Sequence, residues 1–206
     1  MKRSKSSKQW LRQHFADPYV KKARQEGFRS RAAFKLSEIQ DRDKILKPNM
    51  RVVELGAAPG GWSQYVREKV GHKGLVIAVD LLPMDAIAGV EIIQGDFQEP
   101  VLIQQIMTLL NGDKVDLVIS DMAPNISGMK MVDQARMMQL AELALEFAKT
   151  VLASNGTFLL KIFQGSGTEE YLRQLRQIFS QVLIRKPKAS RANSSEVYLL
   201  AKGFKL

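Results

Sequence analysis

The sequence predicts an α/β fold, with a mostly parallel seven-stranded sheet, helices on both faces and an antiparallel hairpin at one edge. Short segments rich in Val, Ile and Leu alternate along the chain with longer segments of helical periodicity. This alternation is typical of parallel strands buried between helices. The last two apolar segments follow one another without a helix between them, which favours an edge hairpin.

The elements are justified in chain order. Residues 30–46 are expected to form a helix that begins at Ser30, a residue type favoured at N-caps. Its buried face would hold Phe34, Leu36 and Ile39. Apolar runs between turn residues predict strands at 51–55, 75–80, 90–94, 115–120, 156–163, 182–185 and 196–202. Helical periodicity predicts helices at 61–70, 99–110, 133–152 and 168–179.

The 206 residues suit a single domain, with a basic extension over about residues 1–30 that is expected to be partly disordered. No apolar run approaches the roughly 18 residues of a membrane span, and the N-terminus lacks the apolar segment of a secretory signal. A cytoplasmic monomer without membrane contact is therefore expected. The chain has no cysteine and two histidines, so neither a disulfide nor a metal site is expected.

The net charge of +10 is segregated along the chain. Residues 1–50 hold 14 Lys/Arg and 5 Asp/Glu, residues 185–206 hold 6 and 1, and the middle holds 11 and 15. Two basic arms favour a polyanion, because binding phosphates releases condensed counterions. An anionic membrane is the alternative, but it requires an amphipathic basic helix that residues 8–24 match poorly. We therefore predict RNA binding, with phosphate contacts from Arg29, Arg31, Arg185, Lys186 and Arg191.

The segment Gly-Ala-Ala-Pro-Gly-Gly at 56–61 lies between a predicted strand and a predicted helix, as at the start of a nucleotide-binding unit. Its spacing differs from the dinucleotide fingerprint, because Ala58 stands where a second glycine is required. Pro59 also lacks an N–H for a phosphate. A ligand with a nucleoside but no phosphates fits better, and S-adenosylmethionine is the leading candidate. A plain tight turn between strand and helix is the alternative.

Three aspartates, Asp80, Asp96 and Asp121, follow or end predicted strands. The carboxyl ends of parallel strands share one edge of a sheet, where ligands bind. Asp80 is placed to accept both ribose hydroxyls of a nucleoside, and Asp96 to meet the adenine edge. Single aspartates at strand ends are common turn formers. Three of them beside a glycine loop favour a nucleoside site.

Two lysines and a glutamate complete the candidates. Lys161 lies in an otherwise apolar strand that should be central, where a lysine has no edge from which to reach water. A functional role is therefore favoured for Lys161. Lys35 interrupts an apolar helical face, which a solvated lysine explains equally well. Glu196 heads the last strand and, taken alone, would be an ordinary edge-strand acid.

Segments spread over nearly the whole chain resemble the FtsJ/RrmJ family of S-adenosylmethionine-dependent ribose 2′-O-methyltransferases. They are RSRAAFKL at 29–36, VVELGAAPGGWSQYV at 52–66, DLLPMD at 80–85, GDF at 95–97, SDMAPNISG at 120–128, LLKIFQG at 159–165 and KPKASRANSSEVY at 186–198. The resemblance implies a Rossmann-like methyltransferase fold with S-adenosylmethionine as cofactor. It is nearest to the bacterial heat-shock members, which implies 2′-O-methylation of a uridine ribose in large-subunit (23S) ribosomal RNA, within the assembled subunit.

The resemblance also implies a catalytic set of Lys35, Asp121, Lys161 and Glu196. The cofactor contacts that we predict are Gly56, Ala57, Pro59, Gly60, Gly61, Trp62, Asp80, Leu81, Asp96, Phe97 and Asp121. Glu54 departs from the family, which has an aspartate there, so the contact near the methionine moiety is expected to differ in detail.

Methyl transfer to a ribose hydroxyl is an in-line displacement that must align three atoms and remove one proton. Lys161 would either take the proton as a neutral amine or stay charged and stabilise the alkoxide, and the sequence leaves both open. A base methyltransferase is disfavoured, because no aromatic residue follows Pro124 to grip a planar base and no cysteine is present. Methylation of another RNA, such as a transfer RNA ribose, and non-catalytic RNA binding on this scaffold are the alternatives.

Overall fold

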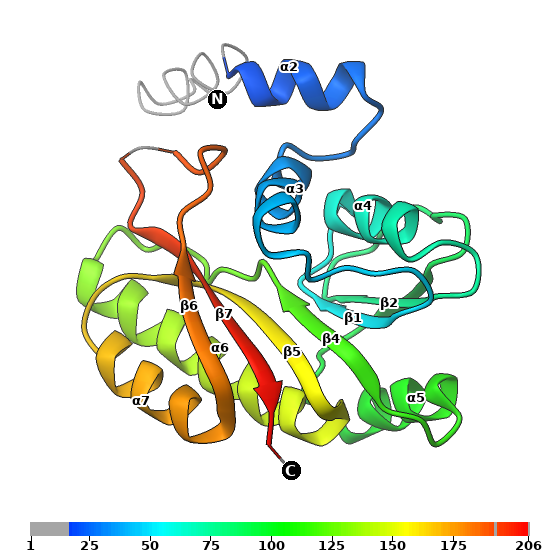
Figure 1. Ribbon diagram of the computed structural model, residues 1–206. Helices are drawn as coiled ribbons and strands as arrows, with labels where there is room; N and C mark the ends of the chain where they lie inside the picture. The colour runs from blue at the N-terminus through cyan, green and yellow to red at the C-terminus, as the bar shows by residue number, and fades with distance from the viewer. Residues whose placement is uncertain (1–16, 192, 206) are drawn as a thin grey trace.

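Seven strands form one sheet whose two faces are covered by helices, which confirms the predicted α/β fold (Figure 1). The computed structural model describes residues 17–191 and 193–205. The strands are β1 (Arg51–Leu55), β2 (Leu75–Asp80), β3 (Glu91–Gln94), β4 (Val115–Ser120), β5 (Leu152–Phe163), β6 (Phe179–Arg185) and β7 (Glu196–Phe204). The helices are α2 (Pro18–Gln25), α3 (Ala32–Asp43), α4 (Gly61–Val70), α5 (Pro100–Leu110), α6 (Lys130–Val151) and α7 (Thr168–Ile178).

The strand order is β3-β2-β1-β4-β5-β7-β6. Strands β1 to β5 are parallel, and β7 is antiparallel to both β5 and β6, so the predicted edge hairpin is confirmed. The chain moves outward from β1 to β3 and then returns to place β4 beside β1. Ligands of parallel sheets bind at the carboxyl ends of the strands where the order reverses, which in this chain is between β1 and β4.

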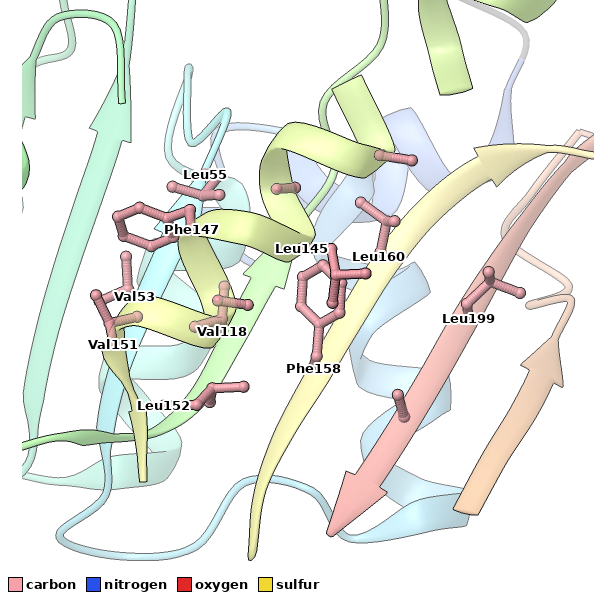
Figure 2. Packing of buried hydrophobic residues seen from close by; sticks show 14 of the residues in the cluster. Val53, Leu55, Val118, Leu145, Phe147, Val151, Leu152, Phe158, Leu160 and Leu199 are labelled. Carbon is pink, nitrogen blue, oxygen red and sulfur yellow. The ribbon is translucent and has the colours of Figure 1, made fainter. Parts of the chain in front are cut away.

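Alternating side chains divide the core into two layers on either side of the sheet. Val53, Val118 and Phe158 face α5, α6 and α7, and Figure 2 shows them packed beside α6. Their neighbours Val52 and Leu117 face the opposite way, toward α3 and α4. The central strands are therefore buried on both faces, which explains why they read as continuous apolar runs in the sequence.

The predicted helix at 30–46 is shorter in the structure, where α3 begins at Ala32 and ends at Asp43. The N-cap of α3 is Arg31, so the predicted N-cap at Ser30 is wrong by one residue. The Ser30 hydroxyl nevertheless accepts a hydrogen bond from the Ala32 amide, at 3.0 Å. The helix ends where Lys44 takes a left-handed conformation with φ 51°. Phe34 and the rest of the predicted buried face are buried.

Several other boundaries differ from the prediction; β6 begins at Phe179 rather than at 182, and β7 ends at Phe204 rather than at 202. The starts of β5 and α6 differ for local reasons. Strand β5 begins at Leu152, which pairs with Val115 before a register shift in the ladder between β4 and β5. Helix α6 begins at Lys130, and Asp133 in its first turn accepts hydrogen bonds from the preceding loop. The predicted elements at 51–55, 61–70, 75–80 and 115–120 have the expected bounds.

Of the basic extension predicted over about 1–30, residues 1–16 lie outside the described residues. From residue 17 the chain forms α2, capped by the Asp17 carboxylate, which accepts from the Tyr19 amide at 2.9 Å. Ala23 of α2 packs with Phe34 of α3 and Ala189 of the loop between β6 and β7. No helix in the described part of the chain is long and apolar enough to cross a membrane.

Candidate functional site

The glycine loop after β1 is tied to β2 and to the loop after β4. The amides of Gly56 and Ala57 donate to the Val79 carbonyl at 2.9 and 3.1 Å. Gly56 has φ +74°, and a Cβ there would lie 2.3 Å from Cγ of Met122. Only glycine therefore allows the loops after β1 and β4 to approach this closely.

The aspartates at the strand ends lie on one rim, as predicted. Asp80 ends β2, and its carboxylate accepts from the Ala58 amide and the Leu82 amide, each at 2.8 Å. Asp96 follows β3 and accepts from the Gln98 amide at 2.9 Å. The two carboxylates are half-buried, so each keeps oxygen lone pairs directed to solvent or a ligand.

The predicted cofactor contacts with large side chains differ in how far they are exposed. The Trp62 indole is buried against Tyr198, with ring centroids 5.7 Å apart, and donates to the Ala32 carbonyl at 2.7 Å. Any contact of Trp62 with a ligand must therefore come from its backbone. Phe97 is buried edge-on against Phe147, whereas Leu81 is 67% exposed beside Asp80.

Glu54 is a buried carboxyl directly below the glycine loop. Its Oε2 accepts from the Ser63 hydroxyl at 2.5 Å, and the residue is 1% exposed. Burial raises the pKa of Glu54 to about 8; the Ser63 hydrogen bond lowers that pKa, and the charges of Asp121 and Asp80 raise it further. Glu54 is consequently protonated at neutral pH, which removes one negative charge from a rim that already holds several.

The predicted catalytic residues come together as two ion pairs. Lys161 Nζ lies 3.1 Å from Asp121 Oδ1 and also donates to the Asp121 carbonyl. Lys35 Nζ lies 2.7 and 2.9 Å from the two oxygens of Glu196. The side chains are only 8 to 18% exposed, so both pairs are largely shielded from water.

Strand alternation explains why these groups meet. Lys161 of β5 is the register partner of Tyr198 on β7, so both side chains face α3, which carries Lys35. Glu196 lies two residues before Tyr198 and therefore faces the same side. Three of these residues, Lys35, Lys161 and Glu196, line a pocket of about 370 Å³. Arg31 and Arg191 lie at its wall, and we name it the lysine pocket.

Sequence reasoning missed two residues of this site. The buried Tyr198 hydroxyl donates to Asp121 Oδ1 at 2.6 Å, and burial raises its pKa well above the ordinary value. The Ser190 hydroxyl donates to Glu196 Oε1 at 2.7 Å. Tyr198 could have been identified by its spacing of two from Glu196, which places both on one strand face. Ser190 lies in an irregular loop and carries no such pattern.

The predicted RNA-binding cations are engaged in different ways. Arg29 donates to the backbone carbonyls of Asp85 and Ala86 at 2.7 and 2.8 Å. Arg185 forms a bidentate ion pair with Asp43, both contacts being 2.7 Å. These two guanidinium groups thus hold protein segments together, which the charge pattern of the sequence did not indicate.

The other three predicted cations lie at or beside the lysine pocket. Arg31 pairs with Asp17 and donates to the Ala189 carbonyl, while Lys186 donates to the Glu196 carbonyl at 2.6 Å. Arg191 is exposed at the pocket wall. Its carbonyl accepts from the Ser194 amide at 3.0 Å, whereas its guanidinium forms no hydrogen bond or ion pair within the described residues.

A family model described as FtsJ-like methyltransferase matches residues 28–204. The chain belongs to this family. Ribosomal RNA large subunit methyltransferase E of Xanthomonas euvesicatoria pv. vesicatoria is 60% identical over 98% of this chain and 96% of that protein. The protein of the same name from Marinobacter nauticus is 57% identical over the full length of both chains.

A solved structure supports the same placement. A protein of Plasmodium falciparum described as a ribosomal RNA methyltransferase superposes with a TM-score of 0.79 and 30% identity, over 86% of this chain and 98% of that one. The family match and the superposed structure thus agree, and each covers most of this chain.

The rim of this FtsJ-like methyltransferase fits a cationic nucleoside cofactor. Asp80, at the end of β2, offers carboxylate oxygens to a ribose diol. Asp96 follows the neighbouring strand β3, and Asp121 follows β4 on the far side of β1. A sulfonium ion is attracted by such an acidic rim, whereas a pyrophosphate would be repelled by it. The positive φ of Gly56 and Gly60 opens the backbone for close approach.

The pKa of Glu54 leads to a prediction about stability. Because folding raises this pKa from 4.5 to about 8, the stability supplied by the neutral carboxyl is complete below pH 4.5 and is lost as the pH rises toward 8. Glu54→Gln does not titrate, so its stability relative to wild type should increase across this range by on the order of a few kcal/mol. Urea denaturation at several pH values measures the difference. Glu142→Gln, an exposed acid on α6, should show no such trend, and a pH-independent difference for Glu54→Gln would contradict the assignment.

Asp80 leads to a prediction about cofactor affinity. Asp80→Ala should weaken binding of S-adenosylmethionine by about 1–3 kcal/mol, because the ribose hydroxyls lose a charged acceptor. Asp80→Asn keeps an acceptor oxygen for the Ala58 amide, so its affinity for S-adenosylmethionine should lie between those of wild type and Asp80→Ala. Titration calorimetry measures the affinity, and equal affinity for all three proteins would remove Asp80 from the site.

Proposed function

We propose that this chain uses S-adenosylmethionine to methylate the 2′-hydroxyl of a uridine ribose in large-subunit (23S) ribosomal RNA. The observation that carries this proposal is the convergence of two lysine–carboxylate ion pairs in one pocket, beside an acidic rim suited to a nucleoside. The names of the relatives support the substrate, because they are ribosomal RNA methyltransferases of the large subunit. We further propose that the substrate is the assembled subunit and that the protein works in the cytoplasm.

The reaction joins the acceptor oxygen to the methyl carbon as the bond from that carbon to sulfur breaks. S-adenosylmethionine, when bound, supplies an electrophilic methyl group on a positively charged sulfur. Asp121 stands between the rim and the lysine pocket, since its carboxylate follows β4 and contacts Lys161. The residues of the lysine pocket hold the acceptor hydroxyl on the side of Asp121 that faces away from the rim.

Lys161 acts as a charged donor in this proposal. Its ammonium lies 3.1 Å from a carboxylate and within hydrogen-bonding reach of a carbonyl, and both contacts suit a cation. The ammonium orients the hydroxyl oxygen and stabilises the negative charge that develops on it. The Asp121 carboxylate is the adjacent acceptor for the hydroxyl proton, while Lys35 and Glu196 hold the ribose from the opposite wall.

Substitution of Lys161 tests this role. Lys161→Ala should lower the methylation rate by about 10²–10⁴-fold while leaving cofactor affinity unchanged. Lys161→Arg separates the two mechanisms, because a guanidinium is always charged and cannot serve as a base. We expect Arg to keep more activity than Ala, measured as transfer of a tritiated methyl group to large subunits from cells that lack the gene. Equal inactivity of the two variants would favour a neutral lysine base, and Lys149→Ala on the exposed face of α6 is the control.

The substrate itself is tested by nucleoside mass spectrometry of ribosomal RNA. RNA from cells without the gene should lack one 2′-O-methylated uridine that reappears when the gene is restored. Restoration of a methylated transfer RNA ribose instead would assign the enzyme to the alternative RNA substrate.

Charge reversal tests the RNA surface. Arg191→Glu should weaken RNA binding and reduce the slope of log affinity against log salt by roughly 0.7–0.9, the contribution of one phosphate contact. Arg176→Glu, an exposed change of the same kind on α7, is the control. An unchanged slope for Arg191→Glu would mean that Arg191 is merely solvated.

A further inference from the structure

A second pocket, of about 590 Å³, opens beside the lysine pocket and has no role in the mechanism above. Its walls come from the loop after β4, the first turns of α6, the loop after β5 and the loop between β6 and β7. The two pockets share Phe163 and Ser194 as lining residues. The second pocket therefore adjoins the site proposed for the acceptor ribose.

The lining combines apolar surface with polar groups. Ile126 is 62% exposed and Met131 is 87% exposed, so two large apolar side chains face solvent next to Phe163. Asn193, Ser194 and Ser195 on the other side supply amide and hydroxyl groups. An apolar wall with a few convergent polar groups is the usual lining of a small-ligand site.

Hydrogen bonds hold the walls in place. The Asp133 carboxylate, on a residue that is 8% exposed, accepts from the amides of Ser127 and Gly128 at 2.8 and 3.1 Å. These bonds lower the pKa of Asp133, so the brace stays ionised. The Gln134 amide donates to the carbonyls of Phe163 and Ser166 at 3.0 and 2.9 Å, which links α6 to the loop after β5. The pocket is thus a built feature of the fold.

We propose that this pocket receives the base of the acceptor nucleotide, turned out of its stack, and we name it the base pocket. The inference rests on the proposed function. The base is attached to C1′ of the ribose, directly beside the C2′ that carries the reacting hydroxyl. When Lys161 holds the hydroxyl, the base is therefore attached one ring carbon away from the carbon that bears this hydroxyl. Phe163 lines both pockets, so the base pocket is next to the pocket that holds the ribose.

The chemistry of the base pocket suits a pyrimidine. The faces of a splayed base are apolar, and in RNA recognition they pack on side chains while the base edge is bonded by polar groups. Ile126, Met131 and Phe163 offer the packing surface. Asn193 provides both a donor and an acceptor, which the O4 and N3–H edge of uracil requires.

A double variant tests the base pocket without disturbing the core. Ile126→Ala with Met131→Ala should raise KM for large subunits from cells without the gene by about tenfold or more. The two side chains are exposed, so the melting temperature and the affinity for S-adenosylmethionine should not change. The contact is apolar, so the salt slope of RNA binding should also stay at the wild-type value. Val101→Ala, 68% exposed on α5, is the matched control.

Photocrosslinking locates the base directly. Subunits from the same cells grown with 4-thiouracil carry photoreactive uridines, and irradiation with wild-type protein should link a thiouridine to residues 126–131 or 193–195. A KM equal to that of the control overturns the proposal. A raised KM without a uridine crosslink in these segments also overturns it, in favour of a contact with a ribosomal protein. If wild-type protein transfers no methyl group to RNA, the proposed function itself has failed, and this outcome is distinct from both.

Discussion

The site depends on one constraint, which is that a lysine in a central strand must be paired. Lys161 lies on β5 between β4 and β7, where neither side of the strand reaches solvent. Its ammonium is satisfied by Asp121, because β4 is the parallel neighbour and ends at the same edge of the sheet. The Tyr198 hydroxyl, from β7, donates to the same carboxylate oxygen, Oδ1 of Asp121. Removing one member would leave a buried charge without its partner, which costs far more than a surface ion pair contributes.

On the other side of Asp121 the unfavourable interaction is repulsion between negative charges, because several acids share one rim. Glu54, Asp80 and Asp121 approach each other where the glycine loop meets β2 and β4, and their mutual repulsion is part of the reason that Glu54 stays protonated. A cation bound at the rim would relieve this repulsion and favour ionisation of Glu54. Affinity for a sulfonium cofactor is thus linked to the pH range in which Glu54 titrates. The extra methylene that distinguishes Glu54 from aspartate places this titrating group against Ser63 of α4.

Much of the fold could be predicted from sequence, because the central strands are apolar on both faces and the turns between them are marked by Gly, Pro and Asp. The start of β5 at Leu152 could not, since it depends on a register shift against Val115 that no local pattern encodes. The convergence of the acids at the strand ends followed from the topology of parallel sheets. The roles of Arg29 and Arg185 did not, because charge counts cannot distinguish a guanidinium that binds backbone carbonyls or Asp43 from one that is free for phosphate.

Helix α3 joins the lysine pocket to the basic loop between β6 and β7. Lys35 and Glu38 lie three residues apart on one face of the helix. Lys35 holds Glu196, and the Glu38 carboxylate accepts from the amides of Lys188 and Ala189 at 2.5 and 2.9 Å. Residues at both ends of the loop therefore contact the same helix, α3. Because Ser190 and Arg191 follow directly, the position of the basic loop is set by the element that carries Lys35. Phosphate contacts made by Arg191 would thus position the RNA relative to Lys161 through helix α3.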